Sequence, residues 1–421
     1  MSSEYIPLEV EAEILKRLPV QSLLRFRSVS KPWKRVIDSP DFVVSYGVRH
    51  PRPSGFIVSH EDAFIVNEYR HYRFFVDDGP SFVPDYFVPP VPYNDLLLLR
   101  DGHPCLVGSS HGLLCFKTIY HERMYDDYHK RRYDDSSSEL SLEMVVLWNP
   151  SIRKSVRIPV PFMYDSPNTS YNVVNAFGFG VCPVTNDPTI LKIKWMDKPG
   201  ISPWRVRVFT LSTGTWNILS TNLPRDSIQL RGSQVVIDRF IYWLAFDRIE
   251  RRDGRDLLHF LIMSFDLTAK EFKEINLTGS LTHWRCGIES ISKLRESLVL
   301  LGYHREFKRH PSVCCLWMMT KEQGGNSSFT KLYNINVPHA KVKTVLGFRK
   351  TGELILVTKQ ESFRGSKLEI YDPNSEANVN LDMHGEDYSF FMCSYTESLF
   401  LLDQFSDFTG FCVVDVNEVL E

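Results

Sequence analysis

The chain has 421 residues, of which 43% are hydrophobic and 13% aromatic, and its 49 basic and 51 acidic residues leave a formal net charge of -2. This length predicts two or three domains or one large repeat architecture, and the balanced charge argues against a dedicated nucleic-acid-binding protein. No apolar run approaches the roughly 18 residues of a membrane span, and the first residues lack the basic and apolar segments of a signal peptide.

The eight cysteines are scattered along the chain without CxxC pairs, and several lie inside apolar runs such as GLLCF and VCCLW. This usage is typical of buried free thiols in a reducing compartment. We therefore expect an intracellular protein, in the cytoplasm, the nucleus or both, with no contact to membranes.

The first fifty residues carry the signals of short helices. Pro7 suits the first turn of a helix, Pro19 is expected to end that helix, and Ser30 and Ser39 are typical N-caps of later ones. We predict three or four short helices over residues 6–46, with a wide apolar surface.

About 40 residues without a disulfide or a metal are marginal as an independent fold, so exposed apolar surface here points to a partner protein. Two alternatives remain. The helices could form a helix-turn-helix with Lys31, Lys34 and Arg35 on phosphates, or they could pack against the rest of the chain.

The stretch IPLEVEAEILKRLPVQSLLRFRSVSKPWKRVIDSPDF, residues 6–42, resembles a plant-type F-box. This resemblance implies binding to the Skp adaptor of Skp–cullin–F-box ubiquitin ligases and, through it, to the cullin and RING subunits. The residues that it places at the adaptor are apolar or proline: Ile6, Pro7, Leu8, Ile14, Leu15, Leu18, Pro19, Leu23, Leu24, Val29 and Trp33. We predict an F-box helical domain over residues 1–48, a linker over 49–54 and an all-β domain over 55–421.

Within the all-β part, a strand that ends in an aromatic residue, a polar turn and a further short strand recur at intervals of roughly 50–60 residues. The recurring aromatic residues, each preceded by a pair of strands, are Trp148, Phe209, Phe265, Trp317 and Tyr371. This spacing is typical of β-propeller blades. We predict six blades, with five or seven as neighbouring possibilities and a β-sandwich plus an extra sheet as the competing fold.

The last unit is incomplete. Residues 389–403 predict a pair of strands, which only the short apolar stretch 410–416 follows. Two strands near the start of the chain, at 55–60 and 72–78, could supply the missing outer strand, and such closure would protect the sheet edges.

Five stretches resemble, in the right order, the F-box-associated domain of plant F-box proteins, a kelch-like propeller. They are GSSHGLLCF at 108–116, LWNPSIRK at 147–154, FGFG at 177–180, SFDL at 264–267 and GFRKTGELIL at 347–356. Val181 stands where the family commonly has Asp, a departure that we expect in a turn. The fold class is therefore α+β and multidomain, a helical F-box followed by a propeller.

The connections between the second and third strands of the blades should share one face, at about 117–142, 196–203, 246–257, 303–312, 359–366 and 403–410. Loops on a rigid scaffold commonly carry binding sites, and Arg and Tyr often anchor protein interfaces. The candidates for substrate binding are Tyr125, Tyr128, Arg131, Arg132, Arg251, Arg252, Arg305 and Arg309. The alternative is that these charges only solvate the loop tips.

No catalytic motif is present. His103 and Cys105 are two residues apart, but the thiol is better explained by packing than by nucleophilic catalysis. The acidic cluster Asp126, Asp127, Asp134 and Asp135 lacks the glycine-centred spacing of a calcium loop. We expect no catalytic residue, no metal and no cofactor.

These observations predict the non-catalytic substrate-recognition subunit of a Skp–cullin–F-box E3 ubiquitin ligase, whose target the sequence does not identify. A narrower possibility is a pollen receptor for secreted ribonucleases. Two rivals remain: an adaptor-bound interaction or scaffold protein outside any ligase, and a propeller enzyme with polar residues clustered at the mouth of its channel.

Overall fold

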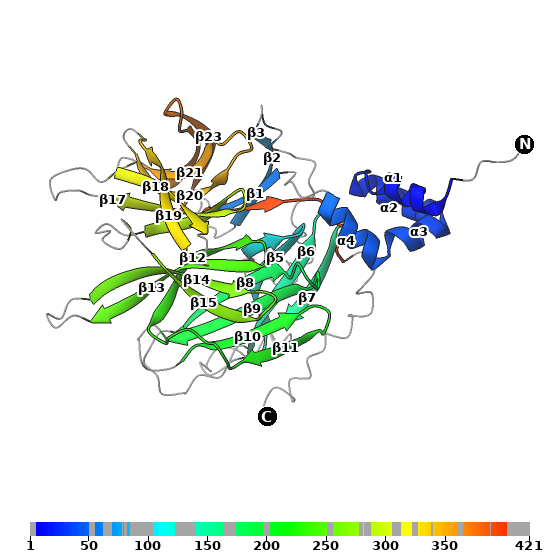
Figure 1. Cartoon of the computed structure of the whole chain (residues 1–421), viewed down its shortest axis with the longest axis horizontal. Helices are drawn as coiled ribbons and strands as arrows, with labels where there is room; N and C mark the ends of the chain where they lie inside the picture. The colour runs from blue at the N-terminus through cyan, green and yellow to red at the C-terminus, as the bar shows by residue number, and fades with distance from the viewer. Residues whose placement is uncertain are drawn as a thin grey trace, which may run out of the picture.

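The computed structural model describes residues 6–49, 55–61, 70–77, 79, 82–84, 104–122, 140–162, 173–196, 203–250, 256–277, 281, 288–304, 313–321, 327–337, 340–360, 365–387 and 389–401. Four helices stand beside a ring of six four-stranded sheets (Figure 1). The predicted fold class, short helices followed by a six-bladed propeller, is confirmed.

The helices are α1 (Leu8–Leu15), α2 (Val20–Val29), α3 (Lys31–Ile37) and α4 (Pro40–Arg49). The two predicted N-caps are confirmed, because Ser30 Oγ accepts a hydrogen bond from the Trp33 amide at 3.4 Å and Ser39 Oγ one from the Phe42 amide at 3.3 Å. Pro19 is the N-cap residue of α2, since α1 already ends at Leu15.

Each blade is an antiparallel sheet of four strands, and its strands are given below from the inner strand to the outer strand. Blade 1 comprises β4 (Cys105–Ser110), β5 (Leu113–Glu122), β6 (Leu140–Asn149) and β7 (Lys154–Pro159); blade 2 comprises β8 (Val173–Val181), β9 (Pro188–Met196), β10 (Arg205–Thr210) and β11 (Thr215–Leu219). Blade 3 comprises β12 (Ile228–Ile237), β13 (Phe240–Glu250), β14 (Asp256–Asp266) and β15 (Glu271–Asn276); blade 4 comprises β16 (Ile288–Leu294), β17 (Ser297–His304), β18 (Val313–Lys321) and β19 (Ser327–Ile335). Blade 5 comprises β20 (Lys341–Phe348), β21 (Leu354–Lys359), β22 (Ser366–Asp372) and β23 (Ala377–Gly385); blade 6 comprises β24 (Phe391–Tyr395), β1 (Gly55–Glu61), β2 (Arg70–Asp77) and β3 (Phe82–Pro84).

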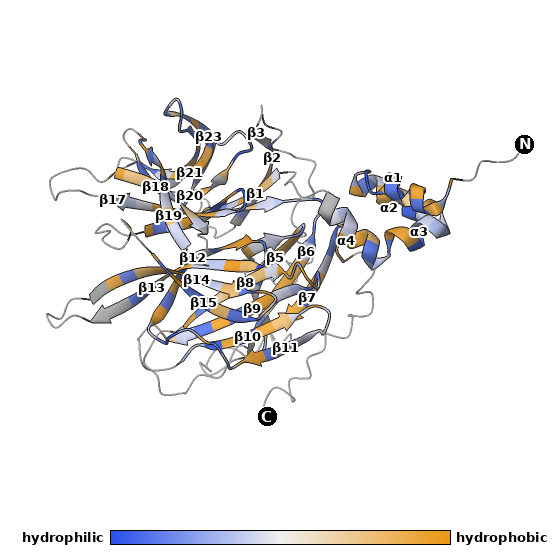
Figure 2. Cartoon of the chain, viewed as in Figure 1, coloured by the Kyte–Doolittle hydropathy of each residue, from blue (hydrophilic) through white to orange (hydrophobic). Residues whose placement is uncertain are grey.

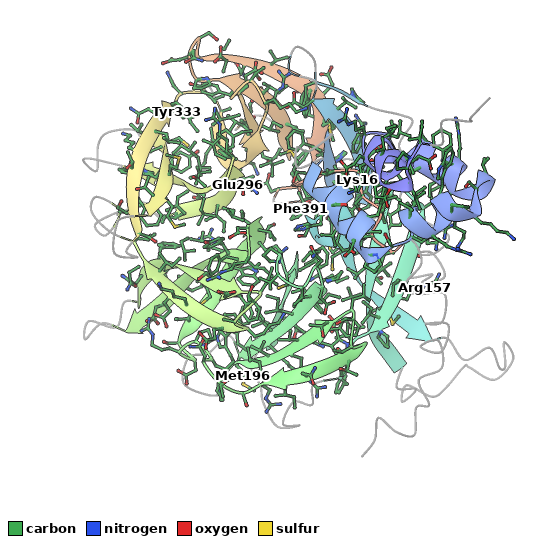
Figure 3. All side chains as sticks on the ribbon, turned by 45° about the vertical axis from the view of Figure 1, so that its right-hand side comes forward. Lys16, Arg157, Met196, Glu296, Tyr333 and Phe391 are labelled. Atoms are coloured by element: carbon green, nitrogen blue, oxygen red, sulfur yellow. The ribbon has the colours of Figure 1, made fainter. Side chains whose placement is uncertain are left out.

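The inner strands of neighbouring blades contact one another around the central axis. Figure 3 shows the ring, with Glu296 and Phe391 near its centre and Arg157, Met196 and Tyr333 toward its outer edge. The five aromatic residues of the predicted repeat all lie on third strands, β6, β10, β14, β18 and β22. This confirms that each repeat corresponds to one blade and that its aromatic residue lies on the third strand.

Blade 6 closes the ring differently from the prediction. Its inner strand β24 comes from the end of the chain and its three outer strands from the beginning. Residues 396–401 form no strand, and 402–421, including the stretch 410–416, lie outside the described residues. The strand β1 is buried from Gly55 to His60, because β24 and β2 cover its edges and its side chains pack against blades 1 and 5.

Val181 does not lie in a turn as predicted. It is the last residue of the inner strand β8 and is fully buried, and its amide donates to Ser110 Oγ of blade 1 at 3.1 Å. An apolar side chain suits this position because it packs in the core between the two blades.

The six cysteines among the described residues are free thiols. Burial raises the pKa of Cys314 to about 12 and the pKa of Cys115 well above its usual range, and both side chains are almost fully covered. Because the thiolate is the reactive form, these residues should resist alkylation in the native protein.

At pH 8 we expect iodoacetamide to modify Cys115 and Cys314 on the order of a thousandfold more slowly than free cysteine, and at the ordinary rate in denaturant. Peptide mass spectrometry of briefly alkylated native and unfolded samples measures this. Rapid labelling of either thiol in the native protein would contradict the packing described here.

Candidate functional site

Apolar side chains are exposed on the helices. Val29, at the end of α2, is 76% exposed, and Ile14, on α1, is 52% exposed. Figure 2 shows hydrophobic residues along α1 to α3, on the part of the helical unit that stands away from the blades. Ile6, Leu8 and Val10, at or near the start of α1, are exposed as well. Exposed apolar side chains are common at sites that bind partner proteins.

The residues predicted at the adaptor divide by burial. Exposed are Ile6, Pro7, Leu8, Ile14, Pro19 and Val29; half-buried are Leu18, Leu24 and Trp33; buried are Leu15 and Leu23. The two buried leucines pack in the core of the helical unit with Val20 and Ile37. In this structure they support the exposed residues and present almost no surface of their own.

Polar contacts fix the helices to one another. Trp33 Nε1 donates to Glu11 Oε2 at 2.8 Å, and its ring meets that of Phe26 edge-on at 5.3 Å. Arg27 of α2 forms an ion pair with Asp38 at the end of α3. These contacts join α1, α2 and α3 into one unit, so that the exposed apolar residues keep a fixed arrangement.

Other parts of the helical unit pack on the propeller. The Val20 amide, at the start of α2, donates to Glu397 Oε2 at 3.2 Å, and Tyr46 of α4 shares an apolar cluster with Leu399 and Leu401. Packing against the rest of the chain, one of the two alternatives from the sequence, is therefore real, but it leaves the apolar residues described above exposed.

These contacts place the helices at one face of the ring. We call it the turn face, because the inner strands end there in turns to the second strands, as at His111–Gly112 in blade 1. The connections between second and third strands leave the opposite face, which we call the loop face. The helices thus lie at the face opposite to the one at which the second strands of the blades end.

All eight predicted substrate-binding residues fall, in the sequence, between the second and third strands of a blade: between β5 and β6, β13 and β14, and β17 and β18. These connections are outside the described residues, so the side chains stay candidates by position. The sixth such connection was predicted wrongly at 403–410. Because β1 and β2 are the middle strands of blade 6, it is the segment 62–69.

A central channel of about 1690 Å³ runs along the inner strands, and Val44 and Gly47 of α4 line it at the turn face. Its charged residues include two ion pairs, Arg231–Glu289 at 3.7 Å and Lys293–Glu296 at 3.1 Å. No group of three potential metal ligands occurs among the residues that the structure describes. None of the helices among the described residues is long and apolar enough to cross a membrane.

One serine–histidine contact lies at the channel. Ser110 Oγ is 3.0 Å from His111 Nδ1, but this hydroxyl also accepts the bond from the Val181 amide and joins two inner strands. Burial, and then the nearby charge of Lys293, lowers the pKa of His111. Of the Cys/His pair considered from sequence, Cys105 is half-buried, and His103 lies outside the described residues.

Sequence reasoning missed the segment 396–401, which it placed in a strand. Asn149 and Gly112, both within stretches quoted above, contact this segment directly. A buried asparagine and a glycine in a tight turn are local signals of close backbone contact, but their partners lie about 250 and about 280 residues away in the sequence.

Comparison with known proteins gives a consistent picture. The F-box domain matches residues 5–45, and the F-box associated beta propeller domain matches residues 99–405. The chain is 27% identical to the F-box protein CPR1 of Arabidopsis thaliana over 79% of this chain and 73% of that protein. It is 24% identical to the putative F-box protein At3g10240 of the same plant over 91% of this chain and 86% of that protein.

Among solved structures, TolB from Acinetobacter baumannii has a TM-score of 0.40 at 10% identity, covering 87% of this chain and 73% of that one. This likeness is too weak to bear on function.

Proposed function

The chain belongs to the plant F-box proteins that carry an F-box associated β-propeller domain, and from this premise we propose that it is the substrate-recognition subunit of a Skp–cullin–F-box ubiquitin ligase. The helices would bind the Skp adaptor and, through it, the cullin and RING subunits. The propeller would hold a target protein beside the charged E2, so that the chain acts through effective concentration rather than chemistry of its own.

The observation that carries this proposal is the exposed apolar surface of Ile6, Leu8, Val10, Ile14 and Val29. Because these side chains are between 40% and 76% exposed, covering what remains exposed is worth about 1 kcal/mol each, and several of them together supply part of a stable interface. The helices keep this surface exposed while they pack on the propeller, and adaptor binding therefore requires no release of the helical unit.

We expect the double substitution Ile14→Asp and Val29→Asp to weaken binding of a plant Skp adaptor by about a hundredfold or more, because two charges would be buried in an apolar contact. Both side chains are exposed, so the variant should fold normally. Alanine at the half-buried Leu18 or Leu24 is a poorer test, since it would also loosen the helical core.

The matched control is Ile218→Asp on β11, since Ile218 is 71% exposed on the propeller. Titration of each full-length variant with the recombinant adaptor, together with a thermal melt, separates lost binding from lost folding. Undiminished adaptor binding by the Ile14/Val29 variant would overturn the proposal.

We place target binding on the loop face, with Tyr125, Tyr128, Arg131, Arg132, Arg251, Arg252, Arg305 and Arg309 as candidates. The support is positional, because the helices occupy the turn face and leave the loop face to a target. The proposal implies a location in the cytoplasm or nucleus. Reconstitution with cullin, RING subunit and E2 would distinguish a ligase from an adaptor-bound scaffold, which would bind its partner without ubiquitinating it.

A further inference from the structure

The ring is closed by a short strand. β24 has five residues and pairs with β1 alone, so a small ladder holds the two ends of the propeller together. The residues that follow, 396–401, which we call the closing segment, lie between blade 1 on one side and the helical unit on the other. Because β24 is hydrogen-bonded along one edge, its stability depends also on what holds the residues that follow it.

Blade 1 holds the closing segment through buried polar contacts. Asn149 Nδ2 donates to the carbonyl oxygens of Ser398 at 3.0 Å and Phe400 at 2.8 Å, and Ser151 Oγ accepts from the Ser398 amide at 3.1 Å. The closing segment also comes very close to the turn after β4. A Cβ atom on Gly112, whose φ is +76°, would lie 2.4 Å from the carbonyl oxygen of Thr396.

The helical unit holds the same segment from the other side. The N-terminus of α2 has no side-chain cap of its own and no acidic residue in its first turn. Glu397 supplies both, because its carboxylate accepts from the Val20 amide at 3.2 Å, where the helix dipole favours negative charge. Leu399, Phe400 and Leu401 pack in one cluster with Val20 and Tyr46.

We infer that the closing segment, by contacting both blade 1 and the helical unit, couples closure of the propeller ring to the packing of the helices on the propeller. On this view the helices and the ring are one rigid body, and each stabilises the other through residues 396–401. For the proposed receptor this would fix the adaptor surface relative to the loop face, but the inference concerns this chain alone and does not depend on the adaptor.

The test is hydrogen exchange of the full chain, followed by mass spectrometry. In Glu397→Ala/Phe400→Ala we expect amides at the start of α2 and in β24 to exchange at least about tenfold faster, while β13 and β14 in blade 3 stay at wild-type rates. Glu397→Gln keeps an acceptor oxygen but loses the charge, so a smaller increase of about two- to fivefold is expected. The matched control is Glu296→Ala, an exposed turn carboxylate on the same face, which should change neither segment.

The reciprocal variant Tyr46→Ala tests the coupling from the helical side. Even if the helices unfold entirely, β24 and β1 should exchange faster, because coupling between two sites is mutual. Wild-type exchange of β24 in Tyr46→Ala, or wild-type exchange of α2 in Glu397→Ala/Phe400→Ala, would overturn the inference. Neither result bears on adaptor binding, which the Ile14/Val29 variant tests separately.

Discussion

Substitution of Arg349 by methionine is expected to lower the free energy of unfolding by about 3–5 kcal/mol. Arg349, in the stretch GFRKTGELIL, links blade 5 to the N-terminal strands of blade 6. Its Nη2 atom donates to the Gly79 carbonyl at 2.8 Å and lies 3.5 Å from Asp77 Oδ1, and its Nη1 pairs with Glu353.

The size of this effect follows from burial. The side chains of Arg349 and Asp77 are 8% and 1% exposed. The Lys350 amide also donates to Asp77, at 2.7 Å, so the carboxylate is held in place. Removal of the guanidinium would leave that carboxylate buried with only amide donors, which is far costlier than loss of an exposed ion pair.

Urea unfolding followed by tryptophan fluorescence measures the change. The matched control is Arg231→Met, because Arg231 is 41% exposed and lies 3.7 Å from Glu289, so we expect a loss of about 1 kcal/mol or less. A loss below about 1 kcal/mol in Arg349→Met would contradict this account.

Substitution of Asn149 by alanine should lower the free energy of unfolding by about 2–4 kcal/mol, the second largest effect we expect. The side chain is fully buried, and its Oδ1 accepts from the Ser151 amide at 2.9 Å while Nδ2 donates to two carbonyls. Those carbonyls would lose their donor, and each unsatisfied buried group costs about 1–3 kcal/mol.

The same unfolding experiment applies, with Asn217→Ala on the outer strand β11 as control. Asn217 is exposed, so a change within about 0.5 kcal/mol is expected there. Equal stability of Asn149→Ala and Asn217→Ala would show that the contacts to the closing segment contribute little.

Periodicity explains why so much of the propeller was predictable. The aromatic residues of third strands recur because the same position in each blade is filled by a large side chain. Phe209, Phe265 and Tyr371 are accordingly buried in equivalent strands. The helices were predictable for a local reason. Ser30 and Ser39 are caps whose partners lie three residues away, so each signal and its contact fall within one window of sequence.

Blade 6 was mispredicted because its strands come from both ends of the chain. The apolar run 399–402 is typical of a strand by itself, and only the closed ring excludes a strand at 399–401. There β24 already completes a blade of four strands, and the next residues fill the space between blade 1 and the helices.

The burial of the residues predicted at the adaptor was undecided for a similar reason. Leu15 and Ile14 are adjacent in sequence and equally apolar, yet one is buried and the other exposed, because only the packing of α1 on its neighbours selects a face. The sequence by itself thus determined the helices, the repeat and the family resemblance, since these depend on contacts or spacings within a short stretch. The tertiary structure decided how the ring closes and where the helices pack on it, because those depend on contacts between residues hundreds of positions apart. It also decided which apolar residues stay exposed, because that depends on how α1 packs on the neighbouring helices.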